Sequence, residues 1–466
     1  MTIQPKFGTS GLRGAAEGLT NDLCAGYTLA FLDLVTELSF TSKTLVLGND
    51  LRPSSRRIAS AIAGAAAARG FELTYAGEVP TPAIALEGFS RQAPSIMVTG
   101  SHNPAQDNGI KFFLPDSELR KEDEVVFQDI SATGIPPLLL PTPDPQPLKS
   151  YLARFRMLFP GKPLGGLKIG VDMHSAVGGK SLAELLSGMG AGCVQFGTEA
   201  RFTPVDTEAL SSKRMNLARS AIRDGNLDAV VSTDGDGDRP LLIAESGEQI
   251  NGDVLGILAA KFLGYRAVVT PVSTTTALEK SKYFQTVRRT RIGSPYVIAE
   301  MTRLGTETSL PIAGFEANGG FICGGELEWR GRIVHPLMTR DAILPLLAVL
   351  VMSVERRLNL TGLAAELPNR EKRSGRLQSY RIERSQELLT VLRTEISRAR
   401  FMPELGQTTH IDETDGVRMT LQDGRIIHFR PSGNAPELRC YVESDNAGIS
   451  TATLQKALEA AERFEP

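Results

Sequence analysis

Segments with strand-like and helix-like composition alternate along most of this 466-residue chain. Residues 44–48 indicate a strand, residues 55–69 an alanine-rich helix that stops at Gly70, and residues 71–76 a second strand. Strand, helix and strand in succession are typical of an α/β domain that contains parallel strands. This alternation constrains the fold more than any other feature, and it predicts an α/β domain over roughly the first 145 residues.

The chain is too long for one hydrophobic core, so we expect about three or four domains. A second α/β unit is indicated by strand 167–173, helix 181–187 and strand 227–232, and a third by strand 267–271, helix 295–303 and a long helix near 341–357. The last hundred residues predict a smaller α+β domain, with helix 385–398, strands near 417–421, 425–429 and 438–443, and helix 449–464. We therefore predict four domains, at residues 1–147, 148–248, 249–367 and 368–466.

Composition excludes several classes of protein. Proline density over residues 134–147 suits an extended linker, and the basic stretch 370–373 is expected to be a solvated segment between domains. The net charge of -2 gives no global attraction to nucleic acid or to a membrane surface. The apolar run 342–354 is too short to span a bilayer and predicts a buried helix. Widely spaced cysteines and the absence of a secretory signal predict a cytoplasmic protein with reduced thiols.

One serine, Ser101, lies in a turn of small residues that follows the strand-like run 93–98. A strand that ends at Thr-Gly-Ser presents the hydroxyl at the edge of a sheet, where a reacting group can reach it. Lys111, further along the segment TGSHNPAQDNGIKFF, can supply a cation. Because Gly, Asn and Pro also mark ordinary turns, this segment alone fits a plain loop equally well.

Three aspartates alternate with glycines in the segment STDGDGDR. The glycines let the backbone curl so that Asp234, Asp236 and Asp238 converge. Converging carboxylates repel by about 4 kcal/mol per close pair at an intermediate dielectric, and Mg²⁺, which prefers oxygen ligands, relieves that repulsion. The alternative is an EF-hand-like Ca²⁺ loop, but Arg239 and Pro240 break its pattern and the flanks are strand-like.

Two further motifs carry weaker signals. In GFEANGG, Glu316 and Asn318 can exchange hydrogen bonds with adjacent sugar hydroxyls, although a β-turn explains the same residues. In FGTSGLRG, Arg13 is flanked by a glycine that lets the backbone approach a ligand. A third glycine-rich segment, HSAVGGKS, resembles a phosphate-binding P-loop, but His174 stands where the first glycine belongs, so ATP binding there is disfavoured.

A last motif, HFRPSGNAPE, combines a strand that delivers Arg430 with a loop of small residues. The loop offers backbone N–H groups together with the side chains of Ser432 and Asn434 around Gly433. A guanidinium beside such a nest suits a phosphate dianion. A simple hairpin is the plain alternative.

In their order and spacing these segments resemble the α-D-phosphohexomutase family, which includes phosphomannomutases, phosphoglucomutases and phosphoglucosamine mutases. The resemblance covers essentially the whole chain. It implies four domains around a central cleft, three of related α/β topology and a smaller one at the C-terminus. It also implies an isomerase that moves a phosphoryl group between the 6- and 1-positions of a hexose.

The resemblance assigns each motif a role. Ser101 would be the phosphoserine that donates and receives the phosphoryl group, and it would bind Mg²⁺ together with Asp234, Asp236 and Asp238. A hexose 1,6-bisphosphate would be the intermediate and activator. Arg13, Lys111 and Arg239 would surround the phosphoryl group that is transferred. Glu316 and Asn318 would bind the sugar hydroxyls. The phosphate that is not transferred would be bound by Arg430, Ser432, Gly433 and Asn434.

The chain departs from one common bacterial form of the family at two places. That form reads GEMSGH in the glutamate loop, where this chain has Asn318 and Gly320, and a second histidine is replaced by Ser294. Without these histidines, we predict that Lys111 is the general base, with its pKa lowered by neighbouring cations. His102 is the alternative base.

Other functions remain to be weighed. One alternative is a Mg²⁺-dependent phosphatase with an aspartate nucleophile, which would need no phosphoserine. A sugar-phosphate sensor is disfavoured, because it would not need Ser101, the aspartates and Lys111 together. A serine hydrolase is disfavoured because the sequence lacks a G-x-S-x-G elbow. Among substrates, mannose phosphates are favoured, followed by glucose and then glucosamine phosphates. We expect the protein to bind a sugar phosphate and to bind neither nucleic acid nor a membrane. We expect it to be a monomer or a homodimer.

Overall fold

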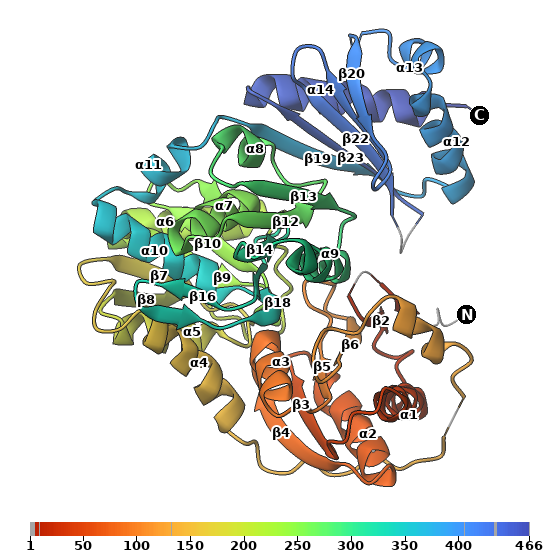
Figure 1. Cartoon of the computed structure of the whole chain (residues 1–466), viewed down its shortest axis with the longest axis vertical. Coiled ribbons are helices and arrows are strands. Elements are labelled where there is room, and N and C mark those ends of the chain that lie inside the picture. Colours follow the sequence, from red (N-terminus) through yellow and green to blue (C-terminus); the bar gives the residue numbers. More distant parts are fainter. Residues whose placement is uncertain (1–4, 9, 132, 405, 433–435, 466) are drawn as a thin grey trace.

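The computed structural model describes residues 5–8, 10–131, 133–404, 406–432 and 436–465. It contains three α/β domains and a smaller C-terminal domain, which we number I to IV along the chain (Figure 1). Domain I lies at the bottom of Figure 1 and domain IV at the top. Among the described residues, every helix is too short or too polar to cross a membrane.

The large sheets of domains I to III share one arrangement of strands. In each sheet the first three core strands are parallel, the fourth is antiparallel, and the lateral order is fourth, third, first, second. These core strands are β3 (Thr44–Asn49), β4 (Glu72–Glu78), β5 (Ser95–Val98) and β6 (Asp107–Phe113) in domain I; β7 (Lys168–Asp172), β8 (Gly192–Phe196), β9 (Ala229–Thr233) and β10 (Pro240–Ala244) in domain II; and β12 (Ala267–Pro271), β13 (Thr286–Thr290), β14 (Ile312–Phe315) and β15 (Phe321–Gly324) in domain III.

Additional strands extend these sheets. They are β1 (Lys6–Phe7) and β2 (Leu12–Ala15) in domain I, β11 (Gln249–Ile250) in domain II, and β18 (Leu337–Asp341) in domain III. Domain III also contains a separate two-stranded sheet, formed by β16 (Leu327–Trp329) and β17 (Arg332–Val334). The repeated topology places the loop between the third and fourth core strands at the same position in each domain. Those three loops carry Ser101, the three aspartates and Glu316, so the sequence motifs occupy equivalent places in three related sheets.

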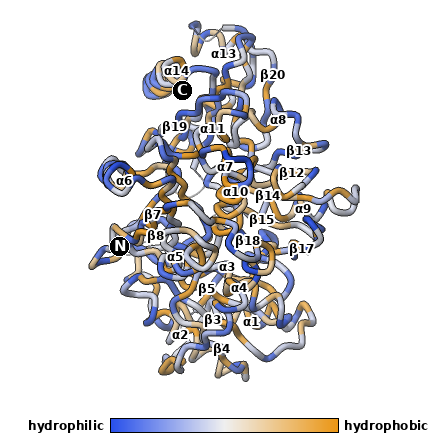
Figure 2. Tube along the Cα trace, turned by 90° about the vertical axis from the view of Figure 1, so that its left-hand side faces the viewer, coloured by the Kyte–Doolittle hydropathy of each residue, from blue (hydrophilic) through white to orange (hydrophobic). Residues whose placement is uncertain are grey.

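Helices cover the sheets. They are α1 (Asn21–Glu37), α2 (Ser55–Ala68), α3 (Thr81–Ser90) and the 3₁₀ helix η1 (Glu122–Phe127) in domain I; α4 (Gln146–Leu158), α5 (Gly179–Gly188) and α6 (Ser212–Gly225) in domain II; and α7 (Gly252–Leu263), α8 (Ala277–Ser281), α9 (Ser294–Glu307), α10 (Ile343–Arg356) and α11 (Leu360–Ala365) in domain III. In Figure 2, α6 is hydrophilic over much of its length, whereas α10 is hydrophobic. No helix or strand occurs in the described residues between η1 and α4, as expected for the proline-rich linker.

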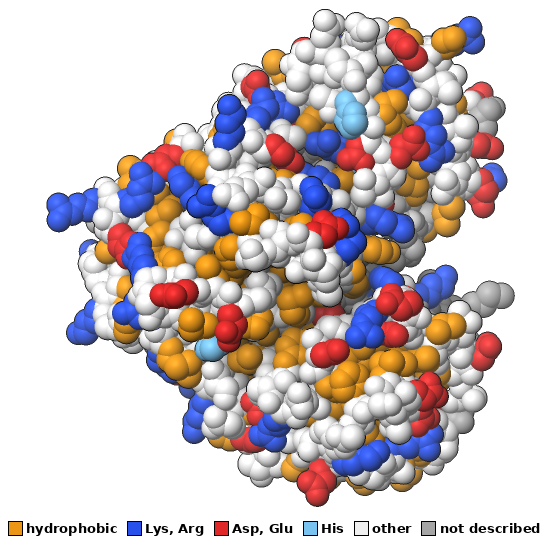
Figure 3. All heavy atoms as spheres, in the orientation of Figure 1, with side chains coloured by type: hydrophobic (Ala, Val, Ile, Leu, Met, Phe, Trp, Pro, Cys, Tyr) orange, Lys and Arg blue, Asp and Glu red, His pale blue; other side chains and the backbone are white. Residues whose placement is uncertain are grey.

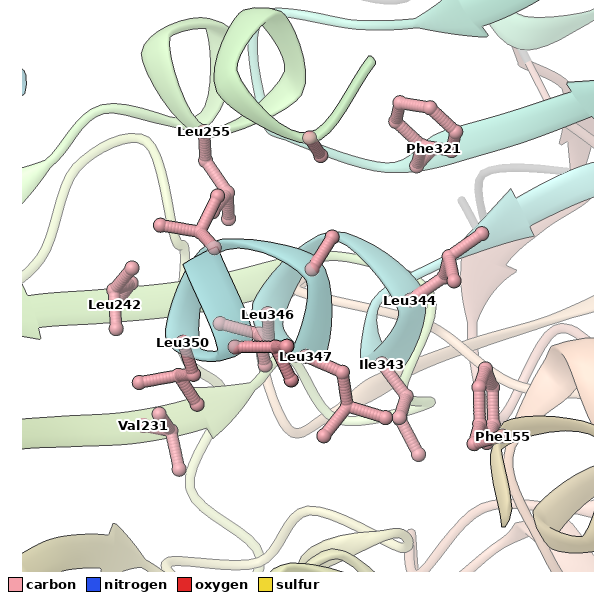
Figure 4. Packing of buried hydrophobic residues seen from close by; sticks show 14 of the residues in the cluster. Phe155, Val231, Leu242, Leu255, Phe321, Ile343, Leu344, Leu346, Leu347 and Leu350 are labelled. Atoms are coloured by element: carbon pink, nitrogen blue, oxygen red, sulfur yellow. The ribbon is translucent and has the colours of Figure 1, made fainter. Parts of the chain in front are cut away.

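Helix α10 is the predicted buried helix, and it joins domains II and III. Every residue from Ile343 to Ser353 is buried. Figure 4 shows its leucines between Val231 and Leu242 of the domain II sheet and Leu255 and Phe321 of domain III. A helix that is apolar on nearly all sides must be surrounded by protein, so this packing explains the apolar run without a membrane.

Domain IV is an antiparallel sheet covered by three helices. The strand order is β19–β23–β22–β21–β20, with bounds β19 (Glu371–Leu377), β20 (Thr408–Asp412), β21 (Val417–Leu421), β22 (Ile426–Pro431) and β23 (Leu438–Ser444), and the helices are α12 (Ile382–Arg393), α13 (Glu395–Phe401) and α14 (Ala447–Arg463). The three central strands and α14 were predicted, whereas both outer strands were not. The single helix predicted over 385–398 is wrong, because Thr394 adopts an extended conformation that separates α12 from α13.

The prediction of a solvated basic segment at 370–373 is also wrong. The Arg370 side chain is 1% exposed and forms ion pairs with Glu443 and Asp445. Lys372 Nζ lies 2.6 Å from Asp253 Oδ2 at the start of α7. Acidic partners that are distant in the sequence turn this basic segment into the first strand of domain IV and its junction with domain III.

Candidate active site

Three loops from three domains form the site. We call them the serine loop (99–106), the aspartate loop (234–239) and the glutamate loop (316–320). Ser101 is 3% exposed, and its hydroxyl donates a hydrogen bond to Asp234 Oδ2 at 2.6 Å. The three aspartates are almost fully buried and carry carboxylate oxygens that all lie within 4.8 Å of one another. The structure thus brings the predicted serine and the predicted metal ligands together.

Arg52 holds the serine loop in place, and sequence reasoning missed it. Its guanidinium donates to four carbonyl oxygens of the loop and its end, those of Ser101 (2.8 Å), Asn103 (2.7 Å), Pro104 (2.6 Å) and Asp107 (2.7 Å). Ser101 has a φ of 50°, which is a left-handed conformation that non-glycine residues rarely adopt. The buried arginine therefore stabilises the strained backbone that carries the hydroxyl. Its position just after β3, in NDLRPSS, was the available signal.

The aspartate oxygens divide into two sets. Lys111 Nζ lies 2.6 Å from Oδ2 of Asp236 and 2.6 Å from Oδ2 of Asp238. The Oδ1 atoms of the same two aspartates are buried and have no hydrogen-bond partner among the described residues. Buried oxygens without partners are costly, and a divalent cation that binds them together with Asp234 and Ser101 removes that cost. The residues present therefore fit a hard cation such as Mg²⁺.

Burial and neighbouring charges set the ionisation of the aspartates. Burial, with repulsion from Asp236 and Asp238, raises the pKa of Asp234 well above its usual range. Burial opposes ionisation of Asp236 as well, but Lys111 outweighs it and the pKa of Asp236 is lowered. The pKa of Asp238 is also lowered, because Arg340 overcomes the effect of burial. Lys111 acts here as the counter-ion of two carboxylates, and its predicted role as a base stays a prediction.

Arg239, Arg13 and His102 line the same site. Arg239 Nε is buried, lies 3.9 Å from carboxylates on both sides, and has no hydrogen-bond partner among the described residues. Burial lowers the pKa of Arg13 to about 10, and within the described part of the chain Arg13 forms no ion pair. His102 Nδ1 lies 3.5 Å from Ser101 Oγ, and its pKa is lowered to about 2 by Arg239 and by burial. Two arginines with unused donors are suited to an anion such as a phosphoryl group.

The glutamate loop is a turn between β14 and β15, and its side chains converge as the sequence predicted. Glu316 is 4% exposed, and Asn318 Nδ2 donates to its Oε2 at 3.4 Å. Arg340 Nη1 from β18 donates to the same oxygen at 2.6 Å. Arg340 also binds Asp238, so it links the glutamate and aspartate loops. No motif surrounds Arg340 in the sequence, and only the fold reveals it.

Both positions that lack the family histidines have a physical explanation. The side chain of Arg340 crosses Gly320 so closely that a Cβ atom there would lie 2.6 Å from Arg340 Cδ, which leaves no room for histidine. Ser294 Oγ donates to Glu118 Oε2 at 3.0 Å, and Thr339 Oγ1 donates to Glu118 Oε1 at 2.7 Å. Glu118 is buried, and burial raises its pKa. These contacts connect domain I to domain III.

Comparisons with known proteins identify the family. Four domain descriptions match in succession, all of phosphoglucomutase/phosphomannomutase: alpha/beta/alpha domain I at residues 4–132, domain II at 149–247, domain III at 251–370 and the C-terminal domain at 375–460. The chain belongs to this family. A phosphomannomutase from Sinorhizobium fredii is 39% identical over 97% of this chain and 98% of its own length.

Other members of the family are similar over most of the chain. A phosphomannomutase from Salmonella muenchen is 40% identical over 94% of this chain and 92% of its own length. A phosphoglucosamine mutase from Jannaschia is 27% identical over 98% of both chains. The crystal structure of a phosphoglucomutase/phosphomannomutase family protein from Burkholderia thailandensis superposes with a TM-score of 0.73 over 98% of both chains, at 20% identity, and shows the same fold.

The last motif of this family member, HFRPSGNAPE, belongs to domain IV. Arg430 is at the end of β22, and its Nε lies 2.8 Å from Asp415 Oδ2. The same Asp415 oxygen accepts a hydrogen bond from Ile292 N of domain III at 2.9 Å. Figure 3 shows the surface hollowed between domain IV above and domain I below. Ser432 is described beside Arg430, whereas Gly433 and Asn434 lie outside the described residues.

The P-loop-like segment has a structural task in this family member. His174 Nε2 lies 2.8 Å from the carbonyl oxygen of Thr233, and Val177 N donates to the carbonyl oxygen of Gly235. The segment therefore stabilises the backbone at the start of the aspartate loop through these hydrogen bonds. The aspartate loop itself lies between two strands, β9 and β10, as the argument against an EF-hand expected.

Proposed function

We propose that this chain is a phosphohexomutase that interconverts mannose 6-phosphate and mannose 1-phosphate. The relatives named phosphomannomutase are 39–40% identical over nearly the full length, whereas the phosphoglucosamine mutase is 27% identical. That difference favours mannose phosphates over glucosamine phosphates as substrates. Glucose phosphates are the next candidates.

The observation that carries the reaction is the position of Ser101. Its buried hydroxyl donates a hydrogen bond to Asp234. Asp236 and Asp238 of the same loop each have a buried carboxylate oxygen with no hydrogen-bond partner among the described residues. A serine in that position can carry a phosphoryl group whose negative charge is balanced by the arginines of the site, Arg13 and Arg239, and by a bound cation. Mg²⁺, when bound by the three aspartates, would supply the electrostatic stabilisation of that phosphoryl group.

Other residues of the site would bind the transferred phosphoryl group, the sugar and the second phosphate. Arg13 and Arg239, which have unused donors, would bind the equatorial oxygens of the phosphoryl group as it moves between Ser101 and a sugar hydroxyl. Glu316 and Asn318 would bind the sugar, and Arg430 would bind the phosphate that stays in place. The sugar would then turn over as a hexose 1,6-bisphosphate and return its other phosphate to Ser101, so one set of contacts would serve both orientations.

The test combines mass spectrometry with a coupled assay. After incubation with a hexose 1,6-bisphosphate, we expect the intact protein to gain the mass of one phosphoryl group, and Ser101→Ala to gain none and to lose turnover. Mannose, glucose and glucosamine 1-phosphates, each assayed with the matching bisphosphate, would rank the substrates. Release of inorganic phosphate by an active Ser101→Ala variant would overturn the proposal in favour of a phosphatase with an aspartate nucleophile.

A further inference from the structure

Arg340 joins two parts of the site that belong to different domains. It lies on β18 of domain III and is 4% exposed. Its Nε and Nη2 atoms donate to Asp238 Oδ2 at 3.1 and 2.7 Å, and its Nη1 donates to Glu316 Oε2 at 2.6 Å. A planar guanidinium can bind two carboxylates in fixed directions, which a lysine ammonium cannot do. The orientations of these two carboxylates are therefore tied to one rigid group.

The fold reserves space for this side chain. A Cβ atom at Gly320 would lie 2.6, 2.9 and 3.0 Å from the Cδ, Cγ and Cβ atoms of Arg340. Residues on both sides of Arg340 are fixed as well, since Thr339 donates to Glu118 at 2.7 Å and Asp341 accepts from Tyr151 at 2.6 Å. Any side chain at position 320 would have to displace the stem of Arg340, because the strand beneath it is held on both sides.

We propose that Arg340 is a positioning residue of the mutase, and that Gly320 provides the space that the Arg340 side chain needs. Arg340 fixes the Asp238 carboxylate of the metal site relative to the Glu316 carboxylate of the sugar site. Asp238 Oδ1 has no hydrogen-bond partner among the described residues, so that oxygen can bind a cation while Arg340 occupies Oδ2. The proposal rests on the proposed function for the identity of the two sites, but not for the contact between Arg340 and Gly320.

Double-mutant cycles test this coupling in the full-length protein. We expect Arg340→Met to lower kcat/KM by roughly 100-fold or more and Gly320→Ala by about 10-fold, as positioning losses of about 1 Å do. The double variant should be no worse than Arg340→Met alone, because a methionine side chain, which no carboxylate holds in place, can turn away from an alanine at position 320. Glu316→Gln should likewise cost much less in the Arg340→Met background than in the wild type, since Glu316 is already misplaced there.

A second arginine provides the matched control. Arg154 is buried and donates to the backbone carbonyls of His335 and Pro336, just before β18. Effects of Arg154→Met and Gly320→Ala should therefore multiply. Arg340→Lys should recover part of the activity that Arg340→Met loses, mainly in kcat, which a merely structural role would not produce.

Two outcomes would overturn the proposal: multiplicative losses for Gly320→Ala and Arg340→Met, or an Arg340→Met enzyme within about 3-fold of wild-type kcat/KM. If Arg340→Met does not fold, the cycle of Gly320→Ala with Arg340→Lys takes its place. If the wild type itself lacks mutase activity, the proposed function fails. Thermal unfolding of the same variants then still decides whether positions 320 and 340 are coupled.

Discussion

The surroundings of Ser101, which we call the pocket, and those of Arg430 in domain IV, the proposed phosphate grip, are built in different ways. Around Ser101, charges are buried and paired across domains, as in the contacts of Lys111 with Asp236 and Asp238. Around Arg430, one ion pair with Asp415 and one hydrogen bond that Ile292 N donates to Asp415 connect this part of domain IV to domain III. The Arg430 side chain is 13% exposed, whereas that of Lys111 is 4% exposed.

This difference separates two tasks. Buried ion pairs between packed domains fix geometry, because breaking one leaves an uncompensated charge in a place that water does not reach. If Arg430 binds the substrate phosphate as proposed, its place on a separate small domain would let it move with the sugar phosphate while the aspartates stay in place. Substitutions in the pocket should therefore affect the chemical step, and substitutions in domain IV should affect substrate binding.

The largest effect is expected in the pocket. Lys111→Ala should lower kcat by roughly 1,000-fold, and it should destabilise the fold by about 3–5 kcal/mol because Asp236 loses its paired cation and Asp238 keeps Arg340 as its hydrogen-bonded cation. His102→Ala should cost less, since the imidazole makes only a long contact with Ser101. Steady-state kinetics and urea unfolding measure both effects. Near-normal turnover of Lys111→Ala beside an inactive His102→Ala would refute the assignment of Lys111 as the base.

Loss of the phosphate grip should be the next largest effect. Arg430→Ala should raise KM by about 100-fold with little change in unfolding temperature, because a charge-assisted bidentate contact to phosphate is lost, whereas the fold loses a single ion pair, the one with Asp415. Arg393→Ala is the matched control in the same domain, since Arg393 pairs only with exposed Glu413. A fall in kcat with an unchanged KM for Arg430→Ala would break the division between pocket and grip.

Sequence reasoning found the residues that belong to short motifs and missed those that act across the fold. Ser101, the aspartates and Glu316 stand in glycine-rich loops between strands, where local composition alone marks them. Arg52 and Arg340 lie near or within ordinary strands. The loop carbonyl of Ser101 is 49 residues from Arg52, and the carboxylates of Glu316 and Asp238 are 24 and 102 residues from Arg340. A single sequence does not indicate which distant carboxylates or carbonyl groups a buried arginine will meet.

The same limit holds for the fold: elements with a clear local pattern are predicted from the sequence, and those that depend on distant partners are not. Strands β3, β12 and β21 and helices α2 and α10 were predicted close to their observed bounds, because each has a clear apolar pattern and a turn signal at its end. The basic segment that became β19 was taken for a solvated linker, because its paired acids Glu443 and Asp253 lie far away in the sequence. The repeated topology of domains I to III was visible only once the strand order was known.

The junction at the base of domain IV offers a sharper test of the comparison. Lys372→Met leaves Asp253 partly unpaired between domains III and IV, although Thr275 N still donates to it at 2.9 Å. We expect KM to rise by about 10-fold and kcat to change by less than about 2-fold, as for loss of one partner of a largely buried pair far from the chemical step. Small-angle scattering and limited proteolysis should report a looser domain IV. A loss confined to kcat would show that the junction also shapes the pocket.

The smallest effect, and the one of opposite sign, is expected at Asp415. Its carboxylate occupies Arg430 in the place where a substrate phosphate would bind, at 2.8 Å from Nε. Asp415→Asn removes the competing charge, while the amide oxygen can still accept the hydrogen bond from Ile292 N. We therefore expect KM for the sugar phosphate and Kd for inorganic phosphate to fall by about 3-fold, the size of a modest, partly exposed ion pair. Calorimetric titration with phosphate checks this directly, and weaker phosphate binding would mean that Asp415 positions Arg430 and does not compete for it.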